Sequence, residues 1–471
     1  MLRYAYINKI VKNINYIHWL NSYNQLDASM FKYFCMRTEL AKNLILIINK
    51  LKEYGMRKFF DLSFMNRNIG LIIYSRGLSR SGDIMEQLAF VYLAYKIYPS
   101  AYSMGLIMFF SGLGNFIASP FVGVVVDKFN NKKLMILSEI IRFSVLLFLG
   151  IMTLLNYINI TILIIVAIIS SIGESIFESS ALYVVRHNIE DGKFDLYSSY
   201  SSFINTVLRL IAIPIAGVLI DNNLYYTIFF FDAFTFLISA ICVYFIKNMS
   251  LNIYKDENES KQRYSSNFID SLKYLLTKKD ILLLFFISIV ITVLFTPISS
   301  FLPIITSEFL NTSNFSGAIL KFMYQIGIIL SLSLYSKILR NKLKIHSMNL
   351  FLMLILSGTL ISFIIFGNLA SAVVLFFIVG SCAILLEVTN GSRRIEMIDK
   401  KYIGRITSIN TMILYGISPL SSLAFGYIID IISIQKVVLV CAIILAIFGL
   451  VIYSILKRTI TSQDISESNS I

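Results

Sequence analysis

The 471-residue chain is short of charge: only 14% of its residues are charged, whereas 57% are hydrophobic. A soluble domain carries about 25% charged residues to cover its surface. This shortage excludes an ordinary soluble globular protein and predicts an integral membrane protein. Only 6 prolines and 22 glycines occur, so long linkers rich in either residue are not expected.

The residues and motifs of most enzymes are equally scarce. Four cysteines are scattered without metal-ligand or disulfide spacing, and only three histidines occur. The sequence has no G-x-x-x-x-G-K-S/T phosphate-binding loop, no H-E-x-x-H motif and no G-x-S-x-G nucleophile motif. These absences argue against a nucleotide-driven pump, a membrane enzyme and a metal site.

Long apolar runs dominate what is present. A membrane-crossing helix needs about 20 mostly apolar residues. The strands of a membrane β-barrel are about half that length and alternate in polarity. The runs of this chain are longer and do not alternate. Twelve transmembrane helices are therefore predicted, over residues 69–97, 102–126, 134–155, 158–184, 196–220, 224–246, 281–305, 315–336, 347–366, 370–391, 405–429 and 434–456.

Lys and Arg gather in alternate connections between these runs. If the N-terminus is cytoplasmic, the inner connections and the tail hold 23 of them, and the outer connections hold only Lys96 and Lys436, with Lys321 near an outer helix end. The positive-inside rule then places both termini in the cytoplasm. The net charge of +14 is explained by anionic inner-leaflet lipids, without nucleic acid.

A polar break at 247–279 divides the twelve runs into six and six, and sequence fragments recur across it. "GVLID" at 217–221 is followed by "GYIID" at 426–430, and Ile204-Asn205-Thr206 by Ile409-Asn410-Thr411. This pattern predicts two six-helix halves related by an axis along the membrane normal. The expected parts are a basic cytoplasmic extension (1–65, or an artefact of start-codon choice), a first half (66–246), a cytoplasmic central loop (247–280), a second half (281–456) and a cytoplasmic tail (457–471).

The stretch "GVVVDKFNNKK" at 123–133 lies in the short inner connection between the second and third runs. It resembles the signature of the major facilitator superfamily, roughly G-x-x-x-D-R/K-x-G-R/K-R/K. The segments "NRNIG" (66–70), "SGD" (81–83) and "GRITSINT" (404–411) are similar to those of its macrolide-efflux and multidrug-exporter branch. The signature residues, called the gating motif below, are Gly123, Asp127, Lys128, Lys132 and Lys133.

The resemblance implies an all-α integral membrane protein with the major facilitator fold, and a role for the gating motif. In the family, the motif's Asp docks against the inner end of the eleventh helix while the transporter is closed to the cytoplasm. Asp127 would then lie near Arg405, where a helix N-terminus favours a carboxylate. Asn130 stands where most members have Gly, and Asn tolerates the left-handed turn expected there.

Several charged residues lie inside the predicted spans, where each is costly. At about 100° per residue, Arg76, Arg80 and Asp83 fall within an arc of about 60° on one helix face. Two interpretations stay open: neutralised pairs that fix helix packing, or groups that bind protons or substrate. The second interpretation assigns a proton-coupling and substrate cavity to Arg76, Arg80, Asp83, Glu86, Glu174 and Arg209, with contacts between the halves at Glu178, Glu387 and Arg405.

These features favour a secondary transporter that alternates access around a central site. We expect it to export a hydrophobic or amphiphilic, drug- or macrolide-like molecule by proton antiport, with the proton gradient as energy source and no cofactor or metal. A monomer is expected in a bacterial plasma membrane, with anionic lipids and the small-molecule substrate as its partners. The alternatives are a uniporter or lipid-moving protein of the same fold, and a non-transporting scaffold or sensor.

Overall fold

The computed structural model describes residues 66–190, 193–246, 270, 273–334, 345–399 and 402–468, all within one compact unit, Phe64–Ile471. The predicted extension at 1–65 and most of the predicted central loop lie outside the described residues. All regular secondary structure in the described part is helical. The predicted all-α class is therefore confirmed.

Twelve long helices occupy the twelve predicted spans, and a short turn of α11 (Leu302–Ile304) and a π-helix, η3 (Ile305–Phe309), lie between two of them. Ten of the twelve are long and apolar enough to cross a membrane. The exceptions are α3, which contains the charged stretch from Arg76 to Glu86, and α10, whose apolar stretch covers 280–296. The helices are α3 (Arg67–Ile97), α4 (Ala101–Lys128), α5 (Asn131–Leu154), α6 (Ile160–Asn188), α7 (Phe194–Asp221), α8 (Tyr225–Tyr244), α10 (Lys279–Ser300), α12 (Asn314–Leu334), α13 (Ile345–Phe366), α14 (Leu369–Met397), α15 (Ile403–Ile432) and α16 (Ile434–Ser468).

Asparagines mark many of the helix boundaries. The Asn130 side chain accepts a hydrogen bond from the Lys133 backbone N–H (3.2 Å), which caps the first turn of α5. The expectation of a left-handed turn at Asn130 was wrong, because its φ is −67°. The left-handed positions filled by asparagine are Asn156, Asn223 and Asn311, in connections at the other end of the helices.

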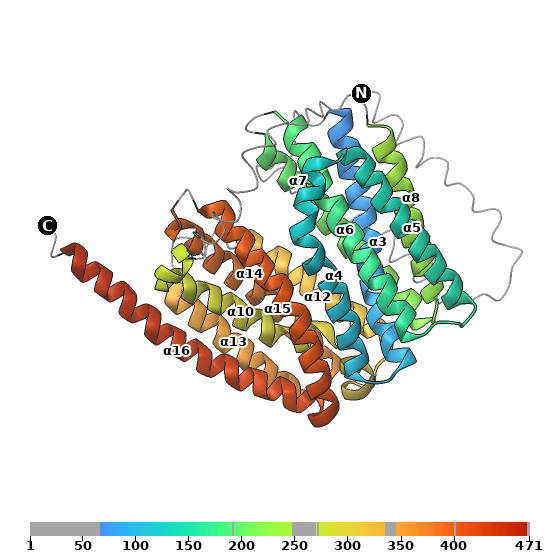
Figure 1. Cartoon of the computed structure of the whole chain (residues 1–471). Helices are drawn as coiled ribbons and strands as arrows, with labels where there is room; N and C mark the ends of the chain where they lie inside the picture. The colour runs from blue at the N-terminus through green and yellow to red at the C-terminus, as the bar shows by residue number, and fades with distance from the viewer. Residues whose placement is uncertain are drawn as a thin grey trace, which may run out of the picture. The chain divides into compact units, whose positions relative to one another are not determined.

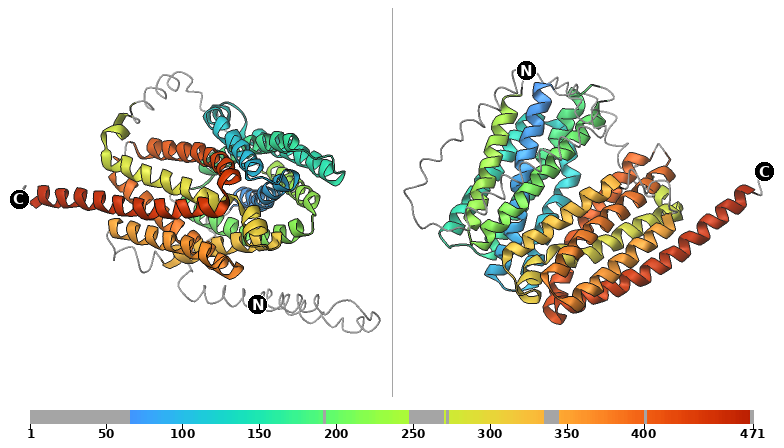
Figure 2. Two further views of the ribbon diagram at one scale, coloured as in Figure 1. Left: turned by 90° about the horizontal axis from the view of Figure 1, so that it is seen from below. Right: turned by 180° about the vertical axis from the view of Figure 1, so that it is seen from behind.

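The helices form two bundles that follow the chain order (Figures 1 and 2). In the first, α3 packs against α6, α7 and α8, and α5 packs between α6 and α8. In the second, α14 packs against α12 and α13, and α16 packs along α13. This arrangement agrees with two six-helix halves.

The halves meet along two helix pairs, α4 with α15 and α7 with α12. At Gly105 in α4, an added Cβ would lie 2.6 Å from the carbonyl oxygen of Ser422, and at Gly426 in α15 it would lie 2.8 Å from that of Ala101. Neither position has room for a side chain, so α4 and α15 approach backbone to backbone there.

The two ends of the helices differ in how the halves meet. We call the end that carries Asp127 the motif end. At the opposite end, Asp430 of α15 accepts hydrogen bonds from the backbone N–H groups of Ala101 (2.7 Å) and Tyr102 (3.0 Å). Asp221 of α7 likewise accepts one from Phe315 of α12 (3.3 Å).

At the motif end α4 is more exposed. Phe121 of α4 is 67% exposed, and a Cβ added to Gly123 would have nothing within 4 Å. Phe121 and Gly123, near the motif end of α4, are therefore not covered by any described part of the second half. Among the described residues, the structure is therefore closed at the opposite end and open at the motif end.

Candidate functional site

A cavity of about 390 Å³ lies between the two halves. Small-molecule sites span roughly 300–1,000 Å³, so this one suits a small solute. Helices α3, α4, α5 and α6 of the first half and α10, α11, α12 and α15 of the second contribute its walls. Its charged lining residues are Asp83, Glu86, Arg142, Glu174 and Lys321.

Arg142 of α5 is the centre of the buried charges. It is only 2% exposed, forms an ion pair with Asp83 of α3, and stacks on the ring of Phe236 with 3.8 Å between guanidinium carbon and ring centroid. Gly173 of α6 makes room for it, since an added Cβ would lie 2.7 Å from the Arg142 side chain. The cation is thus enclosed by a carboxylate, an aromatic ring and a close helix contact.

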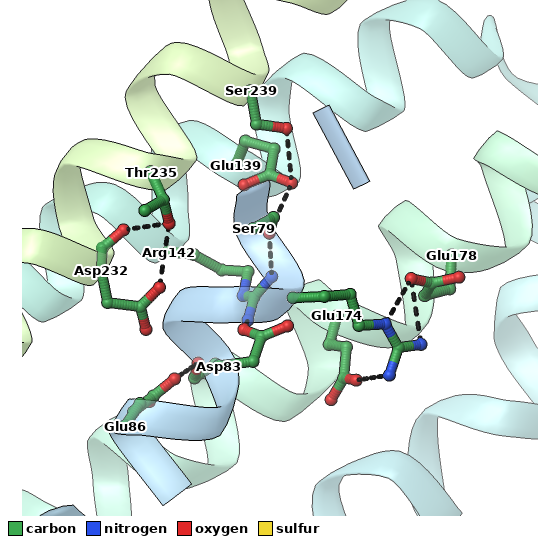
Figure 3. Close-up of polar contacts among 12 residues, drawn as sticks. Ser79, Asp83, Glu86, Glu139, Arg142, Glu174, Glu178, Asp232, Thr235 and Ser239 are labelled. Atoms are coloured by element: carbon green, nitrogen blue, oxygen red, sulfur yellow. Dashed lines mark hydrogen bonds and ion pairs between the residues drawn. The ribbon is translucent and has the colours of Figure 1, made fainter. Parts of the chain in front are cut away.

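Three further carboxylates surround this pair (Figure 3). Glu139 accepts a hydrogen bond from Ser239 (3.1 Å), Glu86 from Ser170 (3.4 Å) and Asp232 from Thr235 (3.0 Å). All three side chains are buried. The buried charge cluster, as we call it below, consists of Asp83, Glu86, Glu139, Arg142 and Asp232.

Some carboxylate oxygens of the cluster accept no hydrogen bond from a described residue. One carboxylate oxygen each of Glu86, Glu139 and Asp232 is buried without a hydrogen-bond partner among the described residues. Carboxylate oxygens of Asp83, Glu86 and Asp232 lie within 4.8 Å of one another. Buried polar atoms are normally paired, so this geometry can hold protons, or a small cation, between the carboxyl groups.

A second charge network lies beside the cluster in the same half. Arg76 pairs with Glu178 and donates to the Tyr197 hydroxyl (2.7 Å). Arg80 contacts Glu178 (3.0 Å) and Glu174 (3.5 Å). Glu178 therefore forms its ion pairs within the first half in this structure, not across the halves as predicted.

The other predicted site residues are only partly brought together. Asp83, Glu86 and Glu174 do line the cavity, but Asp83 pairs with Arg142, not with Arg80. Arg209 forms no ion pair with a described residue. Glu387 is exposed, and the side chain of Arg405 lies outside the described ones.

Sequence reasoning did not assign Arg142, Glu139 or Asp232 to the site, and it missed the central position of Lys321. A signal was present. Glu139 and Arg142 interrupt an otherwise apolar helix three residues apart, and Asp232 stands alone in an aromatic run. Charges at such positions are costly and therefore indicate a partner, but they do not say which helix supplies it.

The gating motif lies at the open end. Lys132 donates to the backbone carbonyl of Ile246 (2.7 Å) and lies 5.5 Å from the ring centroid of Tyr244, which joins the start of α5 to the end of α8. Asp127, Lys128 and Lys133 are exposed. Among the described side chains none contacts the Asp127 carboxylate, and its docking against α15 stays a prediction.

Replacing Asp127 with Asn is expected to leave thermal stability unchanged, because its carboxylate is exposed here. It should weaken the state closed at the motif end, since a carboxylate at a helix N-terminus contributes roughly 0.3–1 kcal/mol, and up to about 2 when partly buried. In a background without the native cysteines, thiol labelling of Ser300→Cys in the cavity wall from the motif end should become faster. Glu396→Gln, at an exposed position, is the control. Unchanged labelling and transport in Asp127→Asn would show that Asp127 does not stabilise the state closed at the motif end.

Comparison with known proteins agrees with this architecture. A sequence profile of the Major Facilitator Superfamily matches residues 77–422. The proposed bacilysin exporter BacE of Bacillus subtilis strain 168 is 25% identical over 272 residues, which cover 57% of this chain and 66% of BacE, just under two thirds.

Solved structures share the fold at low identity. The nucleoside transporter NupG superposes with a TM-score of 0.64 and 14% identity, over 83% of this chain and 99% of NupG. A bacterial homolog of the lysosomal transporter Spinster, inward-facing and unoccupied, superposes with a TM-score of 0.64 and 12% identity, over 84% of this chain and 98% of that protein. The profile match covers most of the chain, and the twelve helices in two bundles around a central cavity agree with it. The chain therefore belongs to the major facilitator superfamily of multi-pass membrane transporters.

Proposed function

We propose that this protein is a secondary active exporter that moves a small amphiphilic molecule out of a bacterial cell by proton antiport. The motif end would face the cytoplasm, with both chain termini, so the structure corresponds to the state open to the cell interior. The cavity supports an amphiphilic solute, because Leu88, Phe90 and Met108 lie beside polar groups in its wall. The direction of transport is supported by BacE, whose name describes an exporter.

The observation that carries the proposal is the composition of the buried charge cluster. Four carboxyl groups surround one guanidinium group, at positions that are almost fully buried. Full ionisation would leave three uncompensated negative charges in a low-dielectric interior, which is costly. Protons on some of these carboxyl groups remove that cost, and their release would change the stability of the two transport states.

Glu86 is the member best placed to carry the transported proton. It lines the cavity and also belongs to the cluster, with an unpartnered oxygen and Asp232 nearby. Asp83 and Glu174, which the sequence also assigned to the cavity, each have a cation, Arg142 and Arg80 respectively. We therefore place proton coupling at Glu86 and Asp232, with Asp83 as the group that holds Arg142.

Glu86→Gln is expected to abolish solute-dependent proton movement while solute exchange without a gradient continues. The amide keeps the size of the side chain but cannot release a proton. The measurement is the signal of a trapped pH-sensitive dye in proteoliposomes of the full chain, during a screen of candidate solutes. Glu190→Gln, at an exposed surface position, is the control.

The outcomes separate the alternatives. Full gradient-driven transport by Glu86→Gln would place the proton path elsewhere. Solute movement by the wild-type protein without proton movement would indicate a uniporter. A wild-type protein that moves no solute in a broad screen would favour a scaffold or sensor.

A further inference from the structure

Lys321 lies in the wall of the central cavity, and no partner for its amine is found in the part of the chain that the structure describes. It lies on α12 of the second half and lines the cavity. Among the described residues, no hydrogen bond or ion pair reaches its amine, and the nearby Arg209 of α7 repels it. A lysine inside a membrane-spanning helix is energetically costly. Such a residue is normally paired or functional.

The wall contributed by the first half carries the opposite charge. Glu86 of α3 and Glu174 of α6 face the cavity there. Asp83 has its charge balanced by Arg142, whereas the contact between Glu174 and Arg80 is long, at 3.5 Å. The cavity thus has a negative wall on one half and a positive group on the other.

Hydroxyl groups fill much of the remaining lining. They come from both halves and would donate or accept hydrogen bonds to a polar solute. These residues are Tyr92, Ser111, Ser170, Ser171, Ser299, Ser300, Ser418 and Ser422.

We propose that the transported solute is a small zwitterion. Lys321 binds its anionic group, a carboxylate or a phosphate, and Glu174, whose contact with Arg80 is long, binds its cationic group. A purely cationic solute would leave Lys321 unpaired, and a purely anionic one would face the two glutamates. This assignment rests on the proposed transport function and names the chemical class of its substrate.

The division of charge between the halves also fits the transport cycle. Because the negative and positive groups lie on different halves, a bound zwitterion makes contacts with both. A solute that stabilises one arrangement of the halves more than another shifts the equilibrium between them. A solute with a single charge would form an ion pair with only one of the two halves, and would shift the equilibrium less.

Thermal unfolding of the purified full chain in detergent tests the proposal without any gradient. The probes are alanyl-alanine, its C-terminal amide, which lacks the anion, and N-acetyl-alanyl-alanine, which lacks the cation. Alanyl-alanine is expected to raise the Tm, with half-saturation at a concentration at least tenfold lower than either blocked form. Lys321→Gln should remove the preference for alanyl-alanine over its amide, and Lys321→Arg should keep it.

Lys436→Gln, an exposed lysine on α16, is the matched control and should bind like the wild type. Each Tm shift is taken relative to the same variant without probe, so a change in stability does not imitate a loss of binding. Equal stabilisation by the amide, an unchanged preference in Lys321→Gln, or no stabilisation by millimolar alanyl-alanine would overturn the proposal. Zwitterion binding without proton-coupled transport would instead refute only the antiport mechanism.

Discussion

Arg142→Met is expected to yield little folded protein, with a strongly lowered Tm in what remains. Methionine fills part of the volume but removes the one cation of the buried charge cluster. Removing one partner of a buried ion pair costs about 3–5 kcal/mol, against a total stability of roughly 5–15 kcal/mol for a typical domain. The measurement is the monodisperse yield and the Tm of the full chain in detergent.

Two comparisons isolate the cause. Arg393→Met breaks an exposed pair with Glu396, whose side chains are 45% and 67% exposed, and such pairs contribute about 0–1 kcal/mol. Arg142→Met combined with Asp83→Asn should recover part of the loss, because the carboxylate most directly left unpaired becomes neutral. A wild-type Tm for Arg142→Met would show that the cluster does not need its cation.

Combined Asp221→Asn and Asp430→Asn is expected to open the end opposite the motif. Each carboxylate accepts hydrogen bonds from the first backbone N–H groups of a helix in the other half. Such a contact is worth about 0.3–1 kcal/mol, and up to about 2 when partly buried. Loss of both should therefore shift the ratio of states by roughly tenfold, since 1.4 kcal/mol corresponds to that factor.

Accessibility of the cavity from the opposite end reports this shift. Ser300→Cys lines the cavity and, in a background without the native cysteines, should react faster with an impermeant thiol reagent added on that side. Asp399→Asn, exposed at the motif end, is the control and should leave the rate unchanged. An unchanged rate in the double variant would mean that the remaining contacts, which include the hydrogen bond from Tyr95 to Glu308 (2.7 Å) and the close packing at Gly105, hold this end closed.

Much of the architecture could be read from the sequence because its signals are local. The length of an apolar run decides whether a helix can cross a membrane, and ten of the twelve helices satisfy that test in the structure. The repeat was visible because related segments keep similar residues at a nearly constant separation. "GVLID" and "GYIID" were recognised as copies in this way.

What those copies do depends on distant parts of the chain. Asp430 contacts residues more than 300 positions away, and nothing in either pentapeptide names a helix N-terminus as its partner. The same limit applies to Asp83. Helical periodicity shows which residues of α3 share a face, but the helix packed against that face is chosen by the tertiary fold. Only the structure could therefore pair Asp83 with Arg142 instead of Arg80.

The position of Lys321 also depends on the tertiary structure. From the sequence, Lys321 was placed near the outer end of its predicted helix. The position of a residue along a predicted span indicates its depth in the membrane, but not which other helices it faces. The structure places it in the wall of the central cavity, since α11 and η3 intervene between α10 and α12 and α12 packs against α7 of the other half. Which residues are charged and buried within a span is thus a property of the sequence, whereas which charges face one another follows from how the helices pack.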